Sequence, residues 1–256
     1  MATWDPKRYL TYADERSRPF HELLSRVSSD KPQTVVDLGC GPGALTAILA
    51  ERWPDADVVG IDSSREMIEA AAPYAGDRVH FRVGDIATWS PERPVDVLVA
   101  NAALQWVPRH RALLPGLVDV LAEGGELAFQ VPGNFDEPSH VLLHRLAADP
   151  RFADSIGAVE RPSAYDAATY LHDLTGLGCA VDAWETTYLH VLQGADPVFT
   201  WISGTGARPV LQALSGERRE EFEHEYKALL REAYPEQSYG TVLPFRRVFV
   251  VARKEA

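Results

Sequence analysis

The feature that most constrains the fold is a glycine-rich turn that follows a short apolar run. Residues 35–38 are apolar except for Asp37, and glycine then occupies every second position, at Gly39, Gly41 and Gly43. An amphipathic helical pattern begins directly after the turn. Because glycine has no side chain, the backbone of such a turn lets a ligand approach closely, and a helix N-terminus favours negative groups. The segment therefore predicts a strand, a turn and a helix that together bind a nucleotide-like ligand.

Two classes of ligand suit this turn. Gly39, Gly41 and Ala44 satisfy the G-x-G-x-x-G/A spacing of dinucleotide-binding proteins, so the turn alone does not exclude NAD. Asp37 argues for the other class, because a carboxylate before the turn repels a pyrophosphate but suits an ammonium or sulfonium group. A glycine turn without any ligand is the third reading.

Apolar runs and helical patterns alternate through the first half of the chain, which favours a parallel sheet with helices on both faces. We expect strands at 34–38, 57–61, 79–83, 95–100 and 126–131, and helices at 45–53, 64–72 and 113–121. Ser63 and Glu66 have the spacing of a capping box for the second helix. The pair Gly124 and Gly125 has the composition of a helix end.

The second half is mostly helical, with patterns at 141–148, 167–175 and 195–234, and it adds strands at 181–192 and 248–252. The predicted fold class is α/β: a Rossmann-like, mostly parallel seven-stranded sheet with helices on both faces, an antiparallel edge strand and helical lid insertions. We expect one domain over 1–256. Its parts are an N-terminal lid segment at 1–30, a ligand-binding core at 31–133, cap helices with one edge strand at 134–243, and a final strand at 244–256.

Polar residues end four of the predicted strands: Asp37, Asp62, Asp85 and Asn101. The carboxyl ends of parallel strands share one edge of the sheet, where ligands bind in such folds. Asp62 can accept two hydrogen bonds from a ribose diol, next to Ser63. Its other reading is a helix cap.

The later strand ends extend the same site. Asp85 can accept from the exocyclic amine of adenine, and Ile86 offers an apolar edge and a backbone N–H. Asn101 can hold the amino-acid end of a methionine-like ligand. A simple turn at Asp85 and loop capping at Asn101 are the alternatives.

Net charge and cysteine usage exclude several partner classes. The chain has a formal net charge of −12 and a pI near 5.1, which disfavours nonspecific binding to nucleic acid or to an anionic membrane. Its two cysteines have no spacing for zinc, so we expect free thiols and no metal. The N-terminus lacks the apolar core of a signal peptide, and no apolar run approaches the ~20 residues of a membrane span. We expect a cytoplasmic protein.

Motif and strand order resemble the class I S-adenosylmethionine-dependent methyltransferases. Four further segments resemble one family among them, the trans-aconitate 2-methyltransferases: Trp4-Asp5-Pro6-x-x-Tyr9-x-x-Tyr12 with Arg16-x-Arg18-Pro19, the run 101–107 from Asn101 to Val107, Trp201-Ile202-x-Gly204-Thr205-Gly206-x-Arg208-Pro209, and Leu243-Pro244-Phe245-Arg246-Arg247. The resemblance implies S-adenosylmethionine as methyl donor, S-adenosylhomocysteine as product, and a small polycarboxylate that becomes a monomethyl ester. Malonyl-carrier-protein O-methyltransferases share the core and also esterify a carboxylate.

This chemistry asks for positioning and not for a catalytic base. A carboxylate is ionised at neutral pH and is its own nucleophile, so we expect no catalytic residue in the strict sense. Arginine forks match carboxylates, and aromatic side chains can close the site. The acceptor residues, by which we mean those expected to bind the methyl-accepting acid, are Tyr9, Tyr12, Arg16, Trp106, Trp201, Arg208 and Arg246, with Arg18 and Arg247 as further candidates.

Several readings stay open. Adjacent Arg246 and Arg247 point to opposite sides of a strand, so at most one of them faces the acceptor. Any single arginine can instead be a solvated surface charge, and any of the aromatic residues can be ordinary lid packing. An NAD-dependent oxidoreductase and a non-catalytic S-adenosylmethionine-binding protein are the rival functions. The oligomeric state is open, with a monomer possible.

Overall fold

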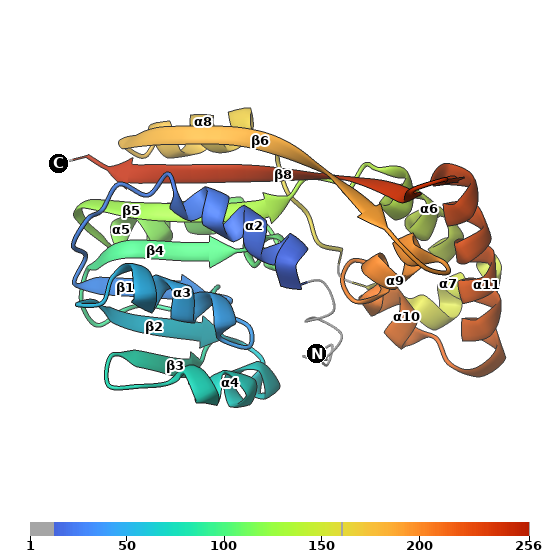
Figure 1. The fold of residues 1–256 in the computed structure, drawn as a ribbon, viewed down its shortest axis with the longest axis horizontal. Helices are drawn as coiled ribbons and strands as arrows, with labels where there is room; N and C mark the ends of the chain where they lie inside the picture. Colours follow the sequence, from blue (N-terminus) through green and yellow to red (C-terminus); the bar gives the residue numbers. More distant parts are fainter. Residues whose placement is uncertain (1–12, 160, 256) are drawn as a thin grey trace.

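Apolar strands form a central sheet with the strand order β3-β2-β1-β4-β5-β8-β6 (Figure 1). The computed structural model describes residues 13–159 and 161–255, with side chains from Ser17 onward. The strands are β1 (Thr34–Leu38), β2 (Asp57–Asp62), β3 (Val79–Val83), β4 (Val95–Asn101), β5 (Leu121–Pro132), β6 (Cys179–Leu192), β7 (Glu236–Gln237) and β8 (Gly240–Lys254). Strands β1 to β5 are parallel, and β8 is antiparallel to both β5 and β6. The expected α/β sheet of seven strands is confirmed, and the structure adds the short β7 beside β8.

Helices cover both faces of this sheet. The described helices are α2 (Ala13–Leu24), α3 (Ala44–Arg52), α4 (Arg65–Ala71), α5 (Leu114–Asp119), α6 (Pro138–Ala147), α7 (Pro150–Ile156), α8 (Ala167–Thr175), α9 (Pro197–Ser203), α10 (Arg208–Ala213) and α11 (Gly216–Ala233), with 3-10 turns η2 (Ala72–Tyr74), η3 (Leu104–Trp106) and η4 (His110–Leu113). Val97 and Val99 of β4 pack in a core with α2 and α3, whereas Leu98 and Ala100 pack in a core with α5 and α8. This alternation is what a strand buried on both faces requires.

Helix α2 is fixed to the edge strand through one carboxylate. Glu22 accepts hydrogen bonds from Trp184 Nε1 at 3.3 Å, Thr186 Oγ1 at 2.8 Å and the Tyr188 hydroxyl at 2.5 Å. The three donors occupy every second position of β6, so they share one face of the strand. These bonds lower the pKa of Glu22, although its burial acts in the opposite direction.

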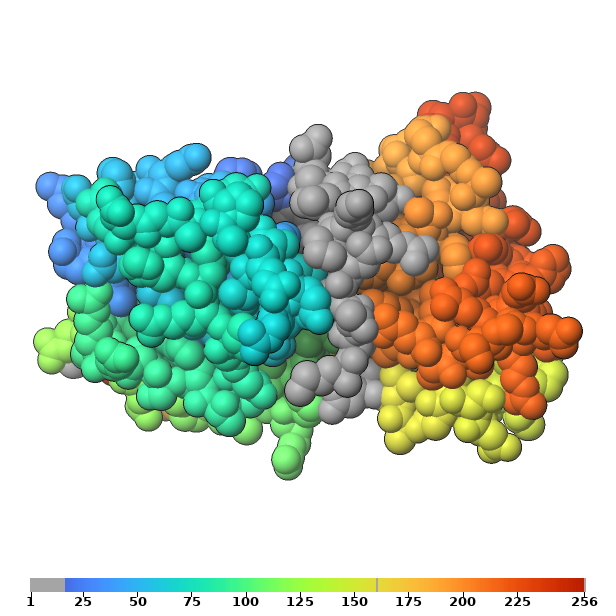
Figure 2. Space-filling view, turned by 90° about the horizontal axis from the view of Figure 1, so that it is seen from below, coloured from blue at the N-terminus to red at the C-terminus, as the bar shows by residue number. Residues whose placement is uncertain are grey.

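The cap has a hydrophobic core of its own. Helices α6, α7, α9, α10 and α11 pack around Phe152, Phe222 and Tyr226, together with Leu192 of β6 and Phe245 of β8. Figure 2 shows the sheet half and this helical half as two lobes. Strands β6 and β8 extend from the sheet into the cap (Figure 1). Helix α8 instead contributes Tyr170 and Leu174 to a core of the sheet, and the division into core and cap segments stays a prediction.

Strands β5 and β8 exceed their expected lengths the most. Strand β5 begins at Leu121 and passes through Gly124 and Gly125, with a register shift against β4. The helix expected at 113–121 therefore ends at Asp119. Strand β8 begins at Gly240, not at 248, because its first half pairs with β6. Pairing partners far along the chain override the local glycine and proline signals in both places.

The N-cap residue of helix α4 also differs from the prediction. Ser64, and not Ser63, is the N-cap: its Oγ accepts from the backbone N–H of Met67 at 3.2 Å. The same hydroxyl donates to Glu66 at 2.7 Å. Strand β2 extends to Asp62, and Asp62 accepts the backbone N–H of Ser64, which moves the helix start by one residue.

Candidate active site

The three glycines of the turn have left-handed backbone angles, with φ of 78° at Gly39, 55° at Gly41 and 85° at Gly43. Their surroundings differ. A Cβ built on Gly39 would lie 2.3 Å from the Cβ of Ala103, and one on Gly43 would lie 2.8 Å from the Cβ of Ala71. A Cβ on Gly41 meets nothing within 4 Å. Gly39 and Gly43 are therefore required by packing, whereas Gly41 faces open space where a ligand can approach.

Helix α3 begins directly at this turn. Gly43 is its N-cap, and within the part of the chain that the structure describes no side chain caps the helix. Its first turn carries no acidic residue. The first N–H groups of a helix have no partners within the helix, and together with the helix dipole they favour an anionic group at this point. The turn thus combines an open backbone with a local preference for negative charge.

Asp62 lies beside the turn and organises it. Its Oδ2 accepts the backbone N–H of Gly41 at 2.9 Å, and its Oδ1 accepts that of Ser64 at 2.8 Å. Burial raises the pKa of Asp62, while these two bonds lower it. A carboxylate has about four acceptor positions, so these two bonds leave it with the capacity to accept from a ligand hydroxyl.

Asp37 lies beneath the turn and is 2 % exposed. Thr46 Oγ1 of α3 donates to its Oδ2 at 2.7 Å. Burial raises the pKa of Asp37 to about 7; the Thr46 bond opposes this shift and the nearby Asp62 charge adds to it. The residue is therefore a buried acid that ties β1 to α3 and titrates close to neutrality.

This raised pKa predicts a pH dependence of stability. The folded-state pKa exceeds the ordinary 3.8, so the folded protein holds a proton that the unfolded chain releases, and stability falls as pH rises from 3.8 to about 7. We expect Asp37→Asn to remove on the order of 2–3 kcal/mol of this fall between about pH 5 and about pH 8. Urea unfolding of both proteins at the two pH values measures it. An identical pH slope in both proteins would contradict the assignment.

The carboxyl ends of β1 to β4 form one edge of the sheet, which we call the rim, and the ends of β3 and β4 complete it. Asp85 is exposed and accepts the backbone N–H of Ala87 at 2.9 Å, while Ile86 is half-buried against a core of the sheet. Asn101 is 9 % exposed. Asp37, Asp62, Asp85 and Asn101 thus lie at or just beyond the carboxyl ends of four neighbouring strands, as the sequence predicts.

A strained residue follows Asn101. Ala102 has a φ of 52°, in the left-handed region that costs an L-residue about 1–2 kcal/mol. Its N–H donates to the carbonyl of Gln130 at 2.9 Å, and its carbonyl accepts from Gln105 Nε2 at 2.6 Å. These two bonds hold a turn that brings Ala103 against Gly39. The loop after β4 is therefore packed directly onto the glycine turn.

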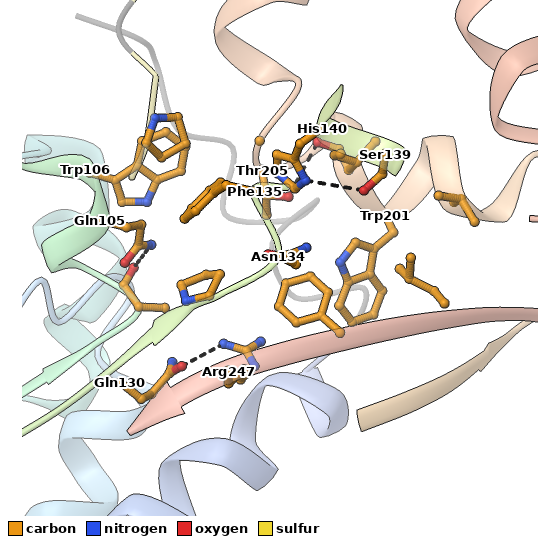
Figure 3. A pocket seen from close by; sticks show the side chains of 18 of the residues that line it. Gln105, Trp106, Gln130, Asn134, Phe135, Ser139, His140, Trp201, Thr205 and Arg247 are labelled. Atoms are coloured by element: carbon orange, nitrogen blue, oxygen red, sulfur yellow. Dashed lines mark hydrogen bonds between the residues drawn. The ribbon is translucent and has the colours of Figure 1, made fainter. Parts of the chain in front are cut away.

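A pocket opens between this rim and the cap. It contains about 840 Å³ of empty space, its open mouth included. Figure 3 shows its aromatic and polar side chains. Aromatic residues of the wall are Trp106, Phe135, Trp201 and Phe245, and polar residues are Asn101, Gln105, Gln130, Asn134, Ser139, His140, Thr205 and Arg247. The described residues that line it include no aspartate or glutamate, so Arg247 gives the pocket a positive character in a chain of net charge −12.

Arg247 is the arginine of β8 that faces this pocket. Its side chain is buried, with the residue 5 % exposed, and Nη1 donates to Gln130 Oε1 at 3.0 Å (Figure 3). Its guanidinium carbon lies 4.8 Å from the ring centre of Phe245. A buried guanidinium is expensive to desolvate, so its place on a pocket wall favours an anionic ligand.

Arg246 points the other way. Its Nε donates to the carbonyl of Gly133 at 2.8 Å, and Nη1 donates to Glu185 at 2.9 Å. Arg246 therefore lies outside the pocket and braces β8, and the acceptor proposal takes Arg247 in its place. The alternation of a strand allows one of the two to face the pocket, and pairing of β8 with β6 decides which.

Other expected acceptor residues have different places. Trp106 and Trp201 line the pocket. Arg208 is half-buried, with its guanidinium carbon 5.7 Å from the ring centre of Trp106, and burial lowers its pKa to about 10. Arg18 is exposed over the ring of Tyr188. Tyr9, Tyr12 and the side chain of Arg16 lie outside the described residues.

The structure adds pocket residues that sequence reasoning did not single out. They are Gln105, Gln130, Asn134, Ser139 and His140. Gln130 has a signal in the sequence, since it is an amide between apolar Phe129 and Val131 at the end of a buried strand. Ser139 and His140 come from α6, whose inward face depends on how the cap packs.

Neither a metal centre nor a membrane span is found in the described part of the chain. No cluster of three or more His, Cys, Asp or Glu residues there could hold a metal ion. None of the described helices is long and apolar enough to cross a bilayer. Cys40 and Cys179 are both buried and free.

Comparisons with known proteins agree with this geometry. Residues 35–125 match the family model described as a methyltransferase domain. Trans-aconitate 2-methyltransferase of Streptomyces avermitilis is 53 % identical, with 100 % of this chain and 98 % of the relative covered. The protein of that name from Rhodococcus jostii is 52 % identical, with 98 % of this chain and 99 % of the relative covered.

A solved structure supports the fold. Geranyl diphosphate C-methyltransferase of Streptomyces coelicolor, solved with S-adenosyl-L-homocysteine, superposes with a TM-score of 0.53 at 16 % identity. The match covers 93 % of this chain and 77 % of that one. At this identity the likeness concerns the fold alone, whereas the relatives near 50 % identity are similar over their whole length. The chain belongs to the trans-aconitate 2-methyltransferase family, within the class I S-adenosylmethionine-dependent methyltransferases.

Proposed function

We propose that this protein transfers a methyl group from S-adenosylmethionine to a carboxylate of a small polycarboxylic acid, and that trans-aconitate is the acid, giving its monomethyl ester. The observation that carries the proposal is the buried Arg247 in a pocket whose described lining has no acidic residue. This pocket shares Asn101 with the rim that carries the glycine turn. The names of the relatives near 50 % identity supply the particular acid.

The residues at the rim fit the donor. The open space at Gly41 admits a ligand against the backbone, and the uncapped N-terminus of α3 suits the carboxylate of an amino-acid end. Asp62 keeps acceptor positions for a ribose diol. The proposed donor-binding set is Asp37, Gly39, Gly41, Gly43, Asp62, Ser63, Asp85, Ile86 and Asn101, in which Asp37 and Gly39 act by shaping the turn.

The chemistry needs little from the protein beyond placement. Bound S-adenosylmethionine supplies an electrophilic methyl group on a sulfonium. The chain's own residues hold the acid, orient one carboxylate oxygen and exclude water, which together can supply much of the rate enhancement. The proposed acceptor set is Arg247, Arg208, Trp106 and Trp201, with Tyr9, Tyr12 and Arg16 as further members.

A panel of acids tests this function. The protein is incubated with methyl-labelled S-adenosylmethionine and with trans-aconitate, citrate, malonate or a monocarboxylate, and the label is read in extractable, alkali-labile ester. We expect the largest kcat/KM for trans-aconitate. Label on no free acid, or only on a malonyl carrier protein, would overturn the proposal.

Arg208 gives a second prediction. We expect Arg208→Ala to raise the KM for trans-aconitate by about 10-fold, because the acid loses a charge-assisted contact with a half-buried guanidinium. The dissociation constant of S-adenosylhomocysteine should change by less than about 2-fold. Steady-state kinetics and calorimetry measure the two values. Equal effects on both would mean that Arg208 supports the fold of the cap and does not contact the acid.

A further inference from the structure

Three buried polar side chains form a continuous chain across three neighbouring strands. Arg247 of β8 donates to Gln130 Oε1 of β5 at 3.0 Å, and Gln130 Nε2 donates to Asn101 Oδ1 of β4 at 2.8 Å. Arg247 is 5 % exposed, Gln130 0 % and Asn101 9 %. All three line the pocket, and Figure 3 shows the bond between Arg247 and Gln130.

The hydrogen-bonding direction of this chain is set from its charged end. A guanidinium has donors only, so Gln130 must offer its oxygen to Arg247 and its NH₂ group to Asn101. Asn101 must then offer Oδ1 to Gln130, which leaves Nδ2 for any other partner. The reverse orientation of Gln130 would place two donors against each other. The chain therefore has one satisfied arrangement, with the donors pointing from β8 toward β4.

The two ends of this hydrogen-bond chain, Arg247 and Asn101, belong to different halves of the site. Arg247 lies on the wall of the pocket proposed for the methyl-accepting acid, which we call the acceptor wall, whereas Asn101 ends β4 beside the glycine turn. Gln130 also accepts the N–H of Ala102 with its backbone carbonyl at 2.9 Å, so it fixes both the side chain of Asn101 and the turn that follows. Its buried amide is thus the link between the acceptor pocket and the donor rim.

We propose that Gln130 is a positioning residue that makes Asn101 a hydrogen-bond donor toward the amino-acid end of S-adenosylmethionine. The proposal rests on the proposed donor site and adds how one of its residues is oriented. Gln130 itself binds Asn101 and acts through it. Arg247 has a second role in this scheme, because its donors fix the orientation of Gln130 and so decide which atom Asn101 offers to the ligand.

Two isosteric variants separate this role from a structural one. Gln130→Glu keeps both bonds only if Asn101 turns its Nδ2 toward the new carboxylate, which leaves Oδ1 facing the ligand. Gln130→Met removes both bonds and leaves Asn101 free to adopt either orientation. A structural role predicts the larger defect for Gln130→Met, since it strands two buried polar groups. The positioning role predicts the larger loss of ligand affinity for Gln130→Glu.

The measurement is the affinity of each protein for S-adenosylhomocysteine and for 5′-methylthioadenosine, which lacks the amino-acid end. We expect Gln130→Glu to weaken S-adenosylhomocysteine by roughly 10- to 100-fold and Gln130→Met by less than about 5-fold. Affinity for 5′-methylthioadenosine should stay within about 2-fold in both. The amino-acid end carries one carboxylate and one ammonium group, so the added charge alone has no net preference. Gln237→Glu, the same change at an exposed position, is the matched control.

Each outcome decides one question. The proposal is overturned if Gln130→Met weakens S-adenosylhomocysteine as much as Gln130→Glu does, or if 5′-methylthioadenosine loses affinity in parallel. Thermal unfolding of each variant shows that the protein compared is folded. If the wild-type protein binds no S-adenosylhomocysteine, the proposed function fails as well. If it binds and the variants rank in the structural order, this inference alone fails.

Discussion

Arg247→Met should lower kcat/KM for the acid by about 100- to 1,000-fold, which corresponds to ~3–4 kcal/mol. Methionine keeps most of the buried volume beside Phe245 but removes the charge of the acceptor wall. A bound carboxylate would then lose its charge-assisted hydrogen bonds, and the amide and hydroxyl groups of the described lining offer only neutral hydrogen bonds in their place. The loss should appear mainly in KM. Donor-product affinity should fall by less than about 5-fold, because Asn101 can still turn toward that ligand.

The neighbouring arginine provides the comparison. Arg246→Met makes the same chemical change one residue away, on the face of β8 that binds Gly133 and Glu185. We expect less than about a 3-fold change in the KM for the acid, with some loss of stability from the missing ion pair. If Arg246→Met raised this KM as much as Arg247→Met, the assignment of the acceptor wall would be wrong. Steady-state kinetics at saturating donor measure both variants.

The second large effect concerns Gly39 and Gly41, which are both glycines of the sequence motif but are expected to differ when each is replaced by alanine. Gly39→Ala should cost about 2–5 kcal/mol of stability, because it adds a left-handed strain to an overlap with Ala103. Gly41→Ala carries the same left-handed strain of about 1–2 kcal/mol but meets no neighbouring atom. Its methyl group instead projects into the space proposed for the donor. We therefore expect Gly41→Ala to weaken S-adenosylhomocysteine by at least ~10-fold.

Chemical unfolding and ligand calorimetry distinguish the two glycine variants. The loss of stability should be larger for Gly39→Ala. At a temperature where both variants are folded, the loss of affinity for S-adenosylhomocysteine should be larger for Gly41→Ala. Equal stability losses would show that the loop after β4 can move away from Gly39. Unchanged affinity in Gly41→Ala would place the donor elsewhere on the rim.

The glycine turn and its strand were predictable because the signals are local. An apolar run ends at Leu38, the turn has glycine where φ is positive, and β1 has the predicted bounds. Helix α8 also has its predicted bounds, since Asp166 caps it by accepting the N–H of Thr169. In both cases the residues that start or stop the element lie within a few positions of it.

The acceptor pocket depends on pairing between distant segments, which the pattern of one segment does not contain. The first half of β8 exists because β6 pairs with it, and this pairing turns Arg247 inward and Arg246 outward. The start of β5 depends on β4 in the same way, despite the two glycines. The sequence limits the choice to one arginine of the pair, and the tertiary fold makes the selection.

The unbroken ladder between β6 and β8 restricts how proteins of this architecture can change in length. All 14 residues of β6 pair with β8, from the end of the sheet to the inside of the cap. A single-residue insertion in β6 ahead of Trp184 would turn Trp184, Thr186 and Tyr188 away from Glu22. An insertion in β8 ahead of Arg246 would exchange the faces of Arg246 and Arg247. Evolutionary gains and losses in this ribbon must therefore come in pairs or be absorbed by a bulge. Divergence in acceptor size is easier to accommodate in the loops between the cap helices.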